Sequence, residues 1–322
     1  MNKILLDMHC HLMPVDEMRL REIAGVTWLA EQGLMEIDGA LVQPKPLYQP
    51  QALIDWLDQN AIGRGWVSVA PFVYRQALNA ADARQWASYL NDGLLEICAV
   101  RSSRLSPVFH LPVEHPSVAI DIARHWIARG HTRFAMATGA GPKVVLSSDD
   151  YAPLWRALDE AGAFLFLHPP DSFDPRHAPF YLRNLLGNPY ETAVAASHLI
   201  FGRVLERHPG LRVCLAHCGG LTAMVAGRFE RGFDTQRSGV DQAMMRPQQA
   251  LQRLMVDCIS HDPAGLMLAS QVFGEDHILF GSDWPYPMGL PEPHRQLANV
   301  DAALRERILV TNFSALLDAA SG

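Results

Sequence analysis

Four apolar, strand-like runs in this sequence each lead into a residue type that binds metal ions. The first run leads into His9 and His11, and later runs end at His168, His217 and Asp283. In an extended strand, side chains at i and i+2 point the same way, so His9 and His11 present both imidazoles on one side. Two ordinary polar residues leaving a strand would explain that pair alone. All four runs together predict a parallel barrel, which gathers the carboxyl ends of its strands at one face.

Strand-like and helix-like segments alternate along the rest of the chain. The expected strands are 66–70, 105–113, 133–137, 254–259 and the runs ending at 168, 217 and 283. The expected helices are 50–60, 79–97, 117–128, 151–161, 191–206, 221–231, 263–273 and 295–320. This alternation predicts an α/β fold, a single (β/α)8 TIM barrel over residues 1–322. An open doubly wound sheet is the alternative, but residues 139–142 lack the glycine spacing of a dinucleotide-binding loop.

Residues 12–49 do not continue the alternation. They have mixed polarity and are interrupted by prolines, and a connection this long in a compact domain is usually functional. We expect an insertion here, forming a lid or subdomain over a site.

Composition excludes several classes of protein. With 49% hydrophobic and 19% charged residues, the 322-residue chain can bury a large core. Its net charge of −7 argues against a nucleic-acid partner. Five cysteines, an odd number, argue against a disulfide framework and for a reducing compartment. We find no signal peptide or membrane span, so a cytoplasmic protein without a membrane partner is expected.

The motif series resembles the amidohydrolase superfamily. Within it, the chain is similar to the decarboxylase branch typified by 2-amino-3-carboxymuconate-6-semialdehyde decarboxylase. The segments that carry the resemblance are 216–220, 227–233, 256–263 and 281–289. The resemblance implies a metal-dependent barrel enzyme that works as a homodimer.

His9, His11, His168 and Asp283 form a set of three imidazoles and one carboxylate. Such a set suits Zn²⁺ best, with Mn²⁺ or another divalent transition ion as alternatives. The resemblance implies the same four ligands. The strand-four lysine that bridges two metals in binuclear amidohydrolases is not visible, because the nearest lysine, Lys143, follows the strand end. We therefore expect one ion.

His217 and Asp283 are the expected catalytic residues. A histidine beside a cation and a carboxylate can transfer protons near neutral pH, and the resemblance gives the histidine at position 217 this acid–base role. A role for His217 as a fifth metal ligand is the alternative.

Arg228 follows His217 by eleven residues, on the next helix. Its planar guanidinium can grip a substrate carboxylate at two points, and the resemblance implies that it does so in the neighbouring subunit's site. The alternative is a solvated arginine paired with Glu230 or Asp234.

Four further residues are expected to bind substrate. Lys45 lies where the resembled enzymes carry a second carboxylate-binding arginine, and can supply charge but not a bidentate grip. Trp284 and Tyr286 would form aromatic walls beside the metal, unless they simply pack the loop. His261 follows an expected strand and would line the pocket.

These observations predict a metal-dependent, non-oxidative decarboxylase of a small conjugated or aromatic carboxylic acid. The same constellation also serves a metal-dependent hydrolase, either a lactonase or a cyclic amidohydrolase. A catalytically inactive barrel is the remaining alternative.

Overall fold

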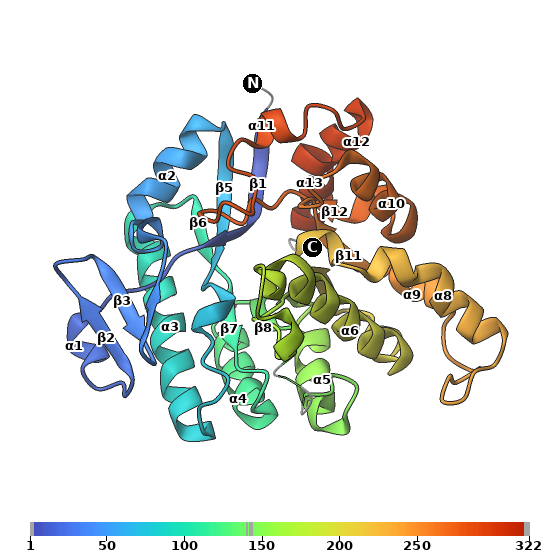
Figure 1. The fold of residues 1–322 in the computed structure, drawn as a ribbon, viewed down its shortest axis with the longest axis horizontal. Helices are drawn as coiled ribbons and strands as arrows, with labels where there is room; N and C mark the ends of the chain where they lie inside the picture. The colour runs from blue at the N-terminus through green and yellow to red at the C-terminus, as the bar shows by residue number, and fades with distance from the viewer. Residues whose placement is uncertain (1–2, 140, 142–143, 319–322) are drawn as a thin grey trace.

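The computed structural model describes residues 3–139, 141 and 144–318, and these form a closed barrel of parallel strands (Figure 1). The barrel strands are β1 (Ile4–His11), β5 (Ile62–Ser68), β6 (Leu105–Pro107), β7 (Phe109–Leu111), β8 (Arg133–Ala137), β9 (Phe164–His168), β10 (Arg212–Leu215), β11 (Leu254–Asp257) and β12 (Ile278–Leu279). β6 and β7 are one barrel strand, because the intervening Val108 N–H donates to Val67 O on β5 at 2.8 Å. The chain around β12 closes the barrel onto β1 through Met8 N–H to Phe280 O (3.1 Å) and His11 N–H to Trp284 O (2.9 Å).

Helices cover the outside of the barrel. They are α2 (Pro50–Gln59), α3 (Ala80–Arg101), α4 (Pro116–Ile127), α5 (Ala152–Glu160), α6 (Asn188–Phe201), α7 (Val204–Arg207), α8 (Thr222–Asp234), α9 (Pro247–Leu251), α10 (Pro263–Phe273), α11 (Pro293–Gln296), α12 (Ala302–Glu306) and α13 (Asn312–Asp318). Each long helix turns an apolar stripe inward, as α5 does with Leu154, Trp155 and Leu158. None of the described helices is long and apolar enough to cross a membrane.

Short helical turns lie mainly in the connections. They are η1 (Lys45–Tyr48), η2 (Pro71–Val73), η3 (Asp149–Tyr151), η4 (Pro175–His177), η5 (Arg183–Gly187), η6 (His217–Gly219), η7 (Glu275–His277) and η8 (Arg307–Thr311). Three of them, η2, η5 and η6, contribute residues to the site.

The predicted barrel is confirmed, with differences at element ends. The strand predicted to end at His217 stops at Leu215, and the one predicted to end at Asp283 stops at Leu279. The helix predicted over 191–206 is two helices, because Arg203 has a left-handed backbone (φ 57°) that an α-helix cannot contain. The helix predicted over 295–320 is broken into α11, α12, η8 and α13, and residues 319 and 320 lie outside the described part of the chain.

Residues 12–49 contain more regular structure than their sequence suggested. After α1 (Glu17–Leu20) comes an antiparallel sheet of β2 (Val26–Leu29), β3 (Leu34–Ile37) and β4 (Ala40–Val42). This segment packs beside α3 (Figure 1), where Asp16 N–H donates to Tyr89 and Arg19 pairs with Asp92. None of the described residues that line the cavity of the candidate site comes from residues 12–49.

Candidate metal centre and active-site cavity

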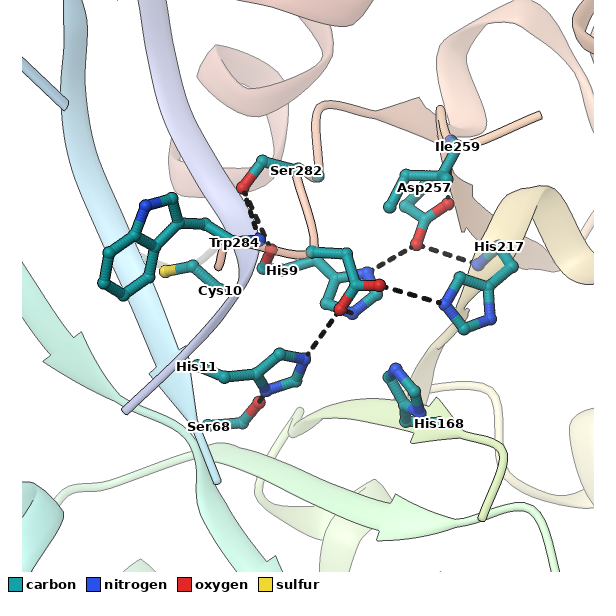
Figure 2. Close-up of polar contacts among 12 residues, drawn as sticks. His9, Cys10, His11, Ser68, His168, His217, Asp257, Ile259, Ser282 and Trp284 are labelled. Carbon is teal, nitrogen blue, oxygen red and sulfur yellow. Dashed lines mark hydrogen bonds and ion pairs between the residues drawn. The ribbon is translucent and has the colours of Figure 1, made fainter. Parts of the chain in front are cut away.

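Three histidines, His9, His11 and His168, lie at the carboxyl ends of the strands with ring centroids 4.9–5.5 Å apart (Figure 2). The Nδ1 atom of each histidine has a hydrogen-bond partner. These partners are Asp257 Oδ2 for His9 (2.8 Å), Ser68 Oγ for His11 (3.1 Å) and Pro169 O for His168 (2.9 Å). A partner on Nδ1 fixes the ring orientation and leaves Nε2 as the metal-binding nitrogen. The Nε2 atoms of His9 and His168 are buried without a hydrogen-bond partner among the described residues.

Asp283 supplies the carboxylate. Its Oδ1 lies 3.1 Å from His11 Nε2 and 3.3 Å from His9 Nε2, while its Oδ2 lies 3.7 Å from His217 Nε2. Ligand atoms of His9, His168, His217 and Asp283 all lie within 4.8 Å of one another. These four side chains therefore fit one divalent ion, and His11 Nε2 lies beside them through its contact with Asp283.

Buried hydrogen bonds between β1 and the segment after β12 fix the position of Asp283. Asp7 accepts hydrogen bonds from Ser282 N (3.0 Å), Ser282 Oγ (2.5 Å) and His9 N (3.1 Å). Gly281 is required here, because a Cβ would lie 2.7 Å from the Cβ of His9. Burial raises the pKa of Asp7 to about 7, although the hydrogen bonds from Ser282 oppose this.

Asp257 at the end of β11 is a functional residue that the sequence reasoning missed. Its Oδ2 accepts from His9 Nδ1–H and from His217 N–H (2.9 Å), and its Oδ1 accepts from the N–H groups of Cys218 (2.8 Å) and Ile259 (3.0 Å). One buried carboxylate thus orients an imidazole of the centre and holds the turn that carries another (Figure 2). It follows an apolar strand, just as the predicted ligands do, and that signal could have identified it.

The carboxylates make this buried point favourable for positive charge. Burial alone lowers the pKa of His9, but Asp283 and Asp257 outweigh it and raise the pKa to about 10. Burial, together with the neighbouring His217, His9 and His11 imidazoles, lowers the pKa of His168 well below its usual value. Burial raises the pKa of Asp283, but His9 and His11 hold it well below its ordinary range. A buried point at which carboxylates favour positive charge has the electrostatic character of a metal site.

His217 differs from the other three histidines. It lies in η6, with left-handed backbones at His217 (φ 53°) and Cys218 (φ 55°), and Asp257 accepts both N–H groups. Its Nδ1 is buried without a hydrogen-bond partner among the described residues, and its Nε2 faces Asp283 Oδ2 at 3.7 Å. His217 therefore stands at the edge of the centre beside a carboxylate, where an imidazole can either transfer a proton or ligate an ion.

A cavity of about 260 Å³ opens above the centre, with His168, His217 and Asp283 in its wall. Its other lining residues are Pro71, Phe72, Pro169, Pro170, Asp171, Ala178, Tyr181, Arg183, Asn184, Asn188, Tyr286, Pro287 and Met288. Residues 169–188, from the end of β9 to the start of α6, contribute eight of the sixteen lining residues and thus have the covering position expected of residues 12–49. A second cavity of about 340 Å³ adjoins it and shares His217, Asn184, Asn188 and Met288.

The predicted substrate-binding residues do not gather at one cavity. Tyr286 lines the 260 Å³ cavity and packs edge-to-face on His11, and burial raises its pKa, so its hydroxyl stays protonated. His261 lines the adjoining cavity and a third one beyond it, but not the 260 Å³ cavity. Trp284 is buried beside Cys10 and does not line either cavity (Figure 2). Lys45 and Arg228 are exposed and line neither cavity in the described chain.

Replacing Asp257 by Asn is expected to weaken metal binding by about 10–100-fold. Asn has only one side-chain oxygen that can accept hydrogen bonds. If that oxygen faces His9, the amide nitrogen lies opposite the N–H groups of Cys218 and Ile259 and leaves them unpaired. In the opposite orientation, the amide nitrogen would donate a hydrogen bond to His9 Nδ1. The ring proton of His9 would then lie on Nε2 and block the binding of a metal ion there. Competition of the protein against a chelator of known Zn²⁺ affinity measures the change.

Asp262→Asn is the matched control. Asp262 is an exposed carboxylate in the loop that follows Asp257, and it caps α10 by accepting a hydrogen bond from Ala264 N–H (2.7 Å). Its Zn²⁺ affinity should equal that of the unmodified protein. Equal affinities for the Asp257→Asn variant and this control would show that Asp257 does not orient the centre.

Known proteins resemble this chain along most of its length. The amidohydrolase family model matches residues 6–318. A 2-amino-3-carboxymuconate-6-semialdehyde decarboxylase of Dictyostelium discoideum is 26% identical, covering 92% of this chain and 85% of its own. A gamma-resorcylate decarboxylase of Rhodococcus jostii is also 26% identical, over 61% of this chain and 65% of its own. Among solved structures, 5-carboxyvanillate decarboxylase from Sphingomonas paucimobilis superposes with a TM-score of 0.82 at 15% identity, covering 98% of this chain and 99% of its own.

The structural neighbour independently supports the barrel, and the family model spans nearly every element that builds the centre. The chain is a member of the amidohydrolase family.

Proposed function

We propose that this protein is a metal-dependent, non-oxidative decarboxylase of a small conjugated or aromatic carboxylic acid. The observation that carries the proposal is the centre itself: imidazoles oriented through Nδ1, one carboxylate, and a further histidine with a free Nδ1 beside a cavity. The names of the two relatives support the reaction, since both are decarboxylases. The cavity of about 260 Å³ is smaller than the roughly 300–1,000 Å³ of drug-sized sites, which favours a single-ring acid.

The proposed cofactor is one Zn²⁺ ion, with Mn²⁺ as the alternative, held by His9, His11, His168 and Asp283. Two buried Nε2 atoms without partners and a buried carboxylate support a transition ion at this point. Such an ion would supply Lewis-acid stabilisation of negative charge that develops on the substrate. Lys143, the residue considered for a second ion, lies outside the described residues.

The protein's own groups perform the rest of the reaction. Loss of CO₂ leaves an electron pair on carbon, and one proton must replace the carboxylate there. His217 is proposed to deliver that proton from Nε2, the nitrogen that lies 3.7 Å from Asp283 Oδ2. Phe72, Tyr286 and Met288 give the cavity an apolar wall, which limits water around the reacting carbon.

Candidate acids labelled with ¹³C in the carboxyl group test the reaction class. The account expects ¹³CO₂ to be released in step with loss of the acid, without any added oxidant. A lactone or cyclic amide that opens while incorporating ¹⁸O from labelled water, with no acid losing CO₂, would instead establish the hydrolase.

A homodimer that shares residues between its sites is a further part of the proposal. Arg228 is exposed on α8, and it has no hydrogen-bond or ion-pair partner among the described residues. The carboxylates of Glu230 and Asp234, its expected alternative partners, are both bound by Arg246 at 2.7 Å. The same helix exposes Met224, and Thr222 is its one fully buried residue. A helix that exposes an unpaired Arg228 and the apolar Met224 supports packing against a second subunit. Arg228 would then enter the cavity of that subunit.

Mixing two inactive variants, Arg228→Ala and His217→Ala, tests this shared site. Random subunit exchange makes half of the dimers mixed, and each mixed dimer would contain one complete site. Activity should therefore recover to about a quarter of that of the unmodified protein. No recovery after exchange has been demonstrated by differential tagging would place Arg228 outside the partner's site.

A cytoplasmic setting completes the proposal. All five cysteines are unpaired and buried, which suits a reducing compartment.

A further inference from the structure

The insertion of residues 12–49, all of which the structure describes, lines no part of the 260 Å³ cavity, yet it is bound to a loop that does. This loop contains η2, whose Phe72 stands in the cavity wall, and Arg75 follows shortly after. We propose that the ion pair between Arg75 and Asp38 of the insertion positions Phe72 against the ring of an aromatic substrate. Asp38 and Arg75 are positioning residues that act from outside the cavity. This inference rests on the proposed function and gives the insertion a part in recognising the substrate.

The Arg75 side chain is bound to the insertion by three hydrogen bonds. Its Nε donates to Asp38 Oδ2 (2.9 Å), and its Nη2 donates to Asp38 Oδ1 (2.7 Å) and to Ala24 O (2.8 Å). Although the Asp38 side chain is 56% exposed, that of Arg75 is only 5% exposed. A bidentate pair with a buried guanidinium has a defined geometry, unlike a solvated pair on the surface.

The insertion is shaped to receive this guanidinium. Gly25 precedes β2 and Asp38 follows β3, and the pairing of these two strands brings them together, with Asp38 N–H donating to Gly25 O (2.7 Å). A Cβ at Gly25, whose backbone is left-handed (φ 76°), would lie 2.4 Å from Asp38 Oδ1 and 2.7 Å from Arg75 Nη2. Only glycine therefore leaves room for the ion pair at this position.

The backbone at Arg75 links the ion pair to η2. Arg75 has a left-handed conformation (φ 52°), which costs a non-glycine residue free energy and persists where its surroundings impose it. Its Cζ lies over the ring of Trp86, 5.5 Å from the ring centre, and Trp86 Nε1 donates to Val73 O at 2.7 Å. The ion pair thus holds both the backbone turn at Arg75 and the indole that fixes the end of η2.

Phe72 meets the cavity at its aromatic wall. Its ring lies edge-to-face on Tyr286, with centroids 5.6 Å apart, and Tyr286 lies edge-to-face on His11 of the centre (5.8 Å). Because Phe72 is 43% exposed, its neighbours do not enclose its ring, and its position depends on the backbone of η2. An apolar ring at this place can contact the ring of an acid whose carboxylate faces the centre.

Protein with 4-fluorophenylalanine at position 72 tests the positioning by ¹⁹F NMR, a readout that needs no substrate. Gly25→Ala and Asp38→Ala should each shift or broaden this signal. Gly33→Ala is the control for the first variant, because Gly33 is also left-handed (φ 63°) in the insertion but a Cβ there would meet nothing within 4 Å. Asp58→Ala is the control for the second, because its carboxylate is similarly exposed (60%) and also pairs with an arginine. Both controls should leave the signal unchanged.

Calorimetric titration of the Zn²⁺-loaded protein tests the consequence for ligands. Asp38→Ala should weaken benzoate binding roughly three- to tenfold, the scale of one aromatic contact, and leave acetate binding unchanged. Phe72→Ala should have the same effect, and Asp38→Ala should add nothing to it in the double variant, because both changes remove one contact. A merely structural role for the ion pair would lower thermal stability but would not depend on Phe72.

Three results would overturn the inference. The first is a ¹⁹F signal that stays unchanged in Gly25→Ala or Asp38→Ala, or that changes equally in their controls. The second is benzoate binding that is no tighter than acetate binding in the unmodified protein, or that Asp38→Ala leaves unchanged. The third is a full additional loss from Asp38→Ala in the Phe72→Ala background. None of these measurements involves turnover, so ¹³CO₂ release judges the decarboxylase proposal separately.

Discussion

Replacing His217 by Asn is expected to lower turnover by about 10²–10⁴-fold while the protein keeps one metal ion per chain. The loss has the size of a general acid–base group, because Asn fills similar space but cannot transfer a proton. Metal is retained because the proposed ligand set does not include His217. Steady-state rates and elemental analysis of the same purified sample give both values.

His11→Asn is the matched comparison, since His11 Nε2 also lies beside Asp283, at 3.1 Å. That variant should lose the metal. If the two variants behave the other way round, with metal lost from His217→Asn and retained in His11→Asn, then His217 is a ligand and His11 is not. This comparison decides between the two ligand sets that the geometry of the centre allows.

Asp283→Ala should reduce metal affinity by more than 100-fold and activity to the background level. Asp283 is the one carboxylate whose oxygens lie within 3.3 Å of two imidazole Nε2 atoms, those of His9 and His11, in the described chain. Removing a ligand should cost more than the 10–100-fold typical of a residue that only orients one. Chelator competition and turnover, measured at several Zn²⁺ concentrations, test the expectation.

Asp92→Ala serves as the control for Asp283→Ala, because Asp92 is an exposed carboxylate on α3 that pairs with Arg19. It should leave metal content and turnover unchanged. Full activity of Asp283→Ala at modest Zn²⁺ would remove Asp283 from the ligand set.

Local patterns predicted the strands and the first candidate ligands. The alternation of side chains along β1 places His9 and His11 together, and β9 ends at His168 as expected. The same rule applied to β11 would have found Asp257. These residues were predictable because strand geometry alone fixes where they point.

The remaining site residues depend on contacts between distant segments. Asp283 reaches the centre from a left-handed backbone (φ 58°) four residues beyond β12, and the buried Asp7 carboxylate holds the residue before it. The cavity-lining residues Tyr181 and Asn184 lie in an irregular segment without apolar periodicity, which packs on Ser172 through Gly187. Neither arrangement leaves a periodic signal in the sequence. Hydrophobic alternation therefore predicts the barrel but not the segments that complete the site.

The fate of the carbon that loses CO₂ tests the central claim most directly. The protein would be incubated in D₂O with a conjugated acid that it consumes, and the product would be examined by ¹H and ²H NMR. The account predicts one deuterium at the former carboxyl carbon for each CO₂ released, with both signals lowered together in His217→Asn. A product that keeps its carboxylate and gains oxygen from water, without deuterium at that carbon, would contradict the decarboxylase assignment.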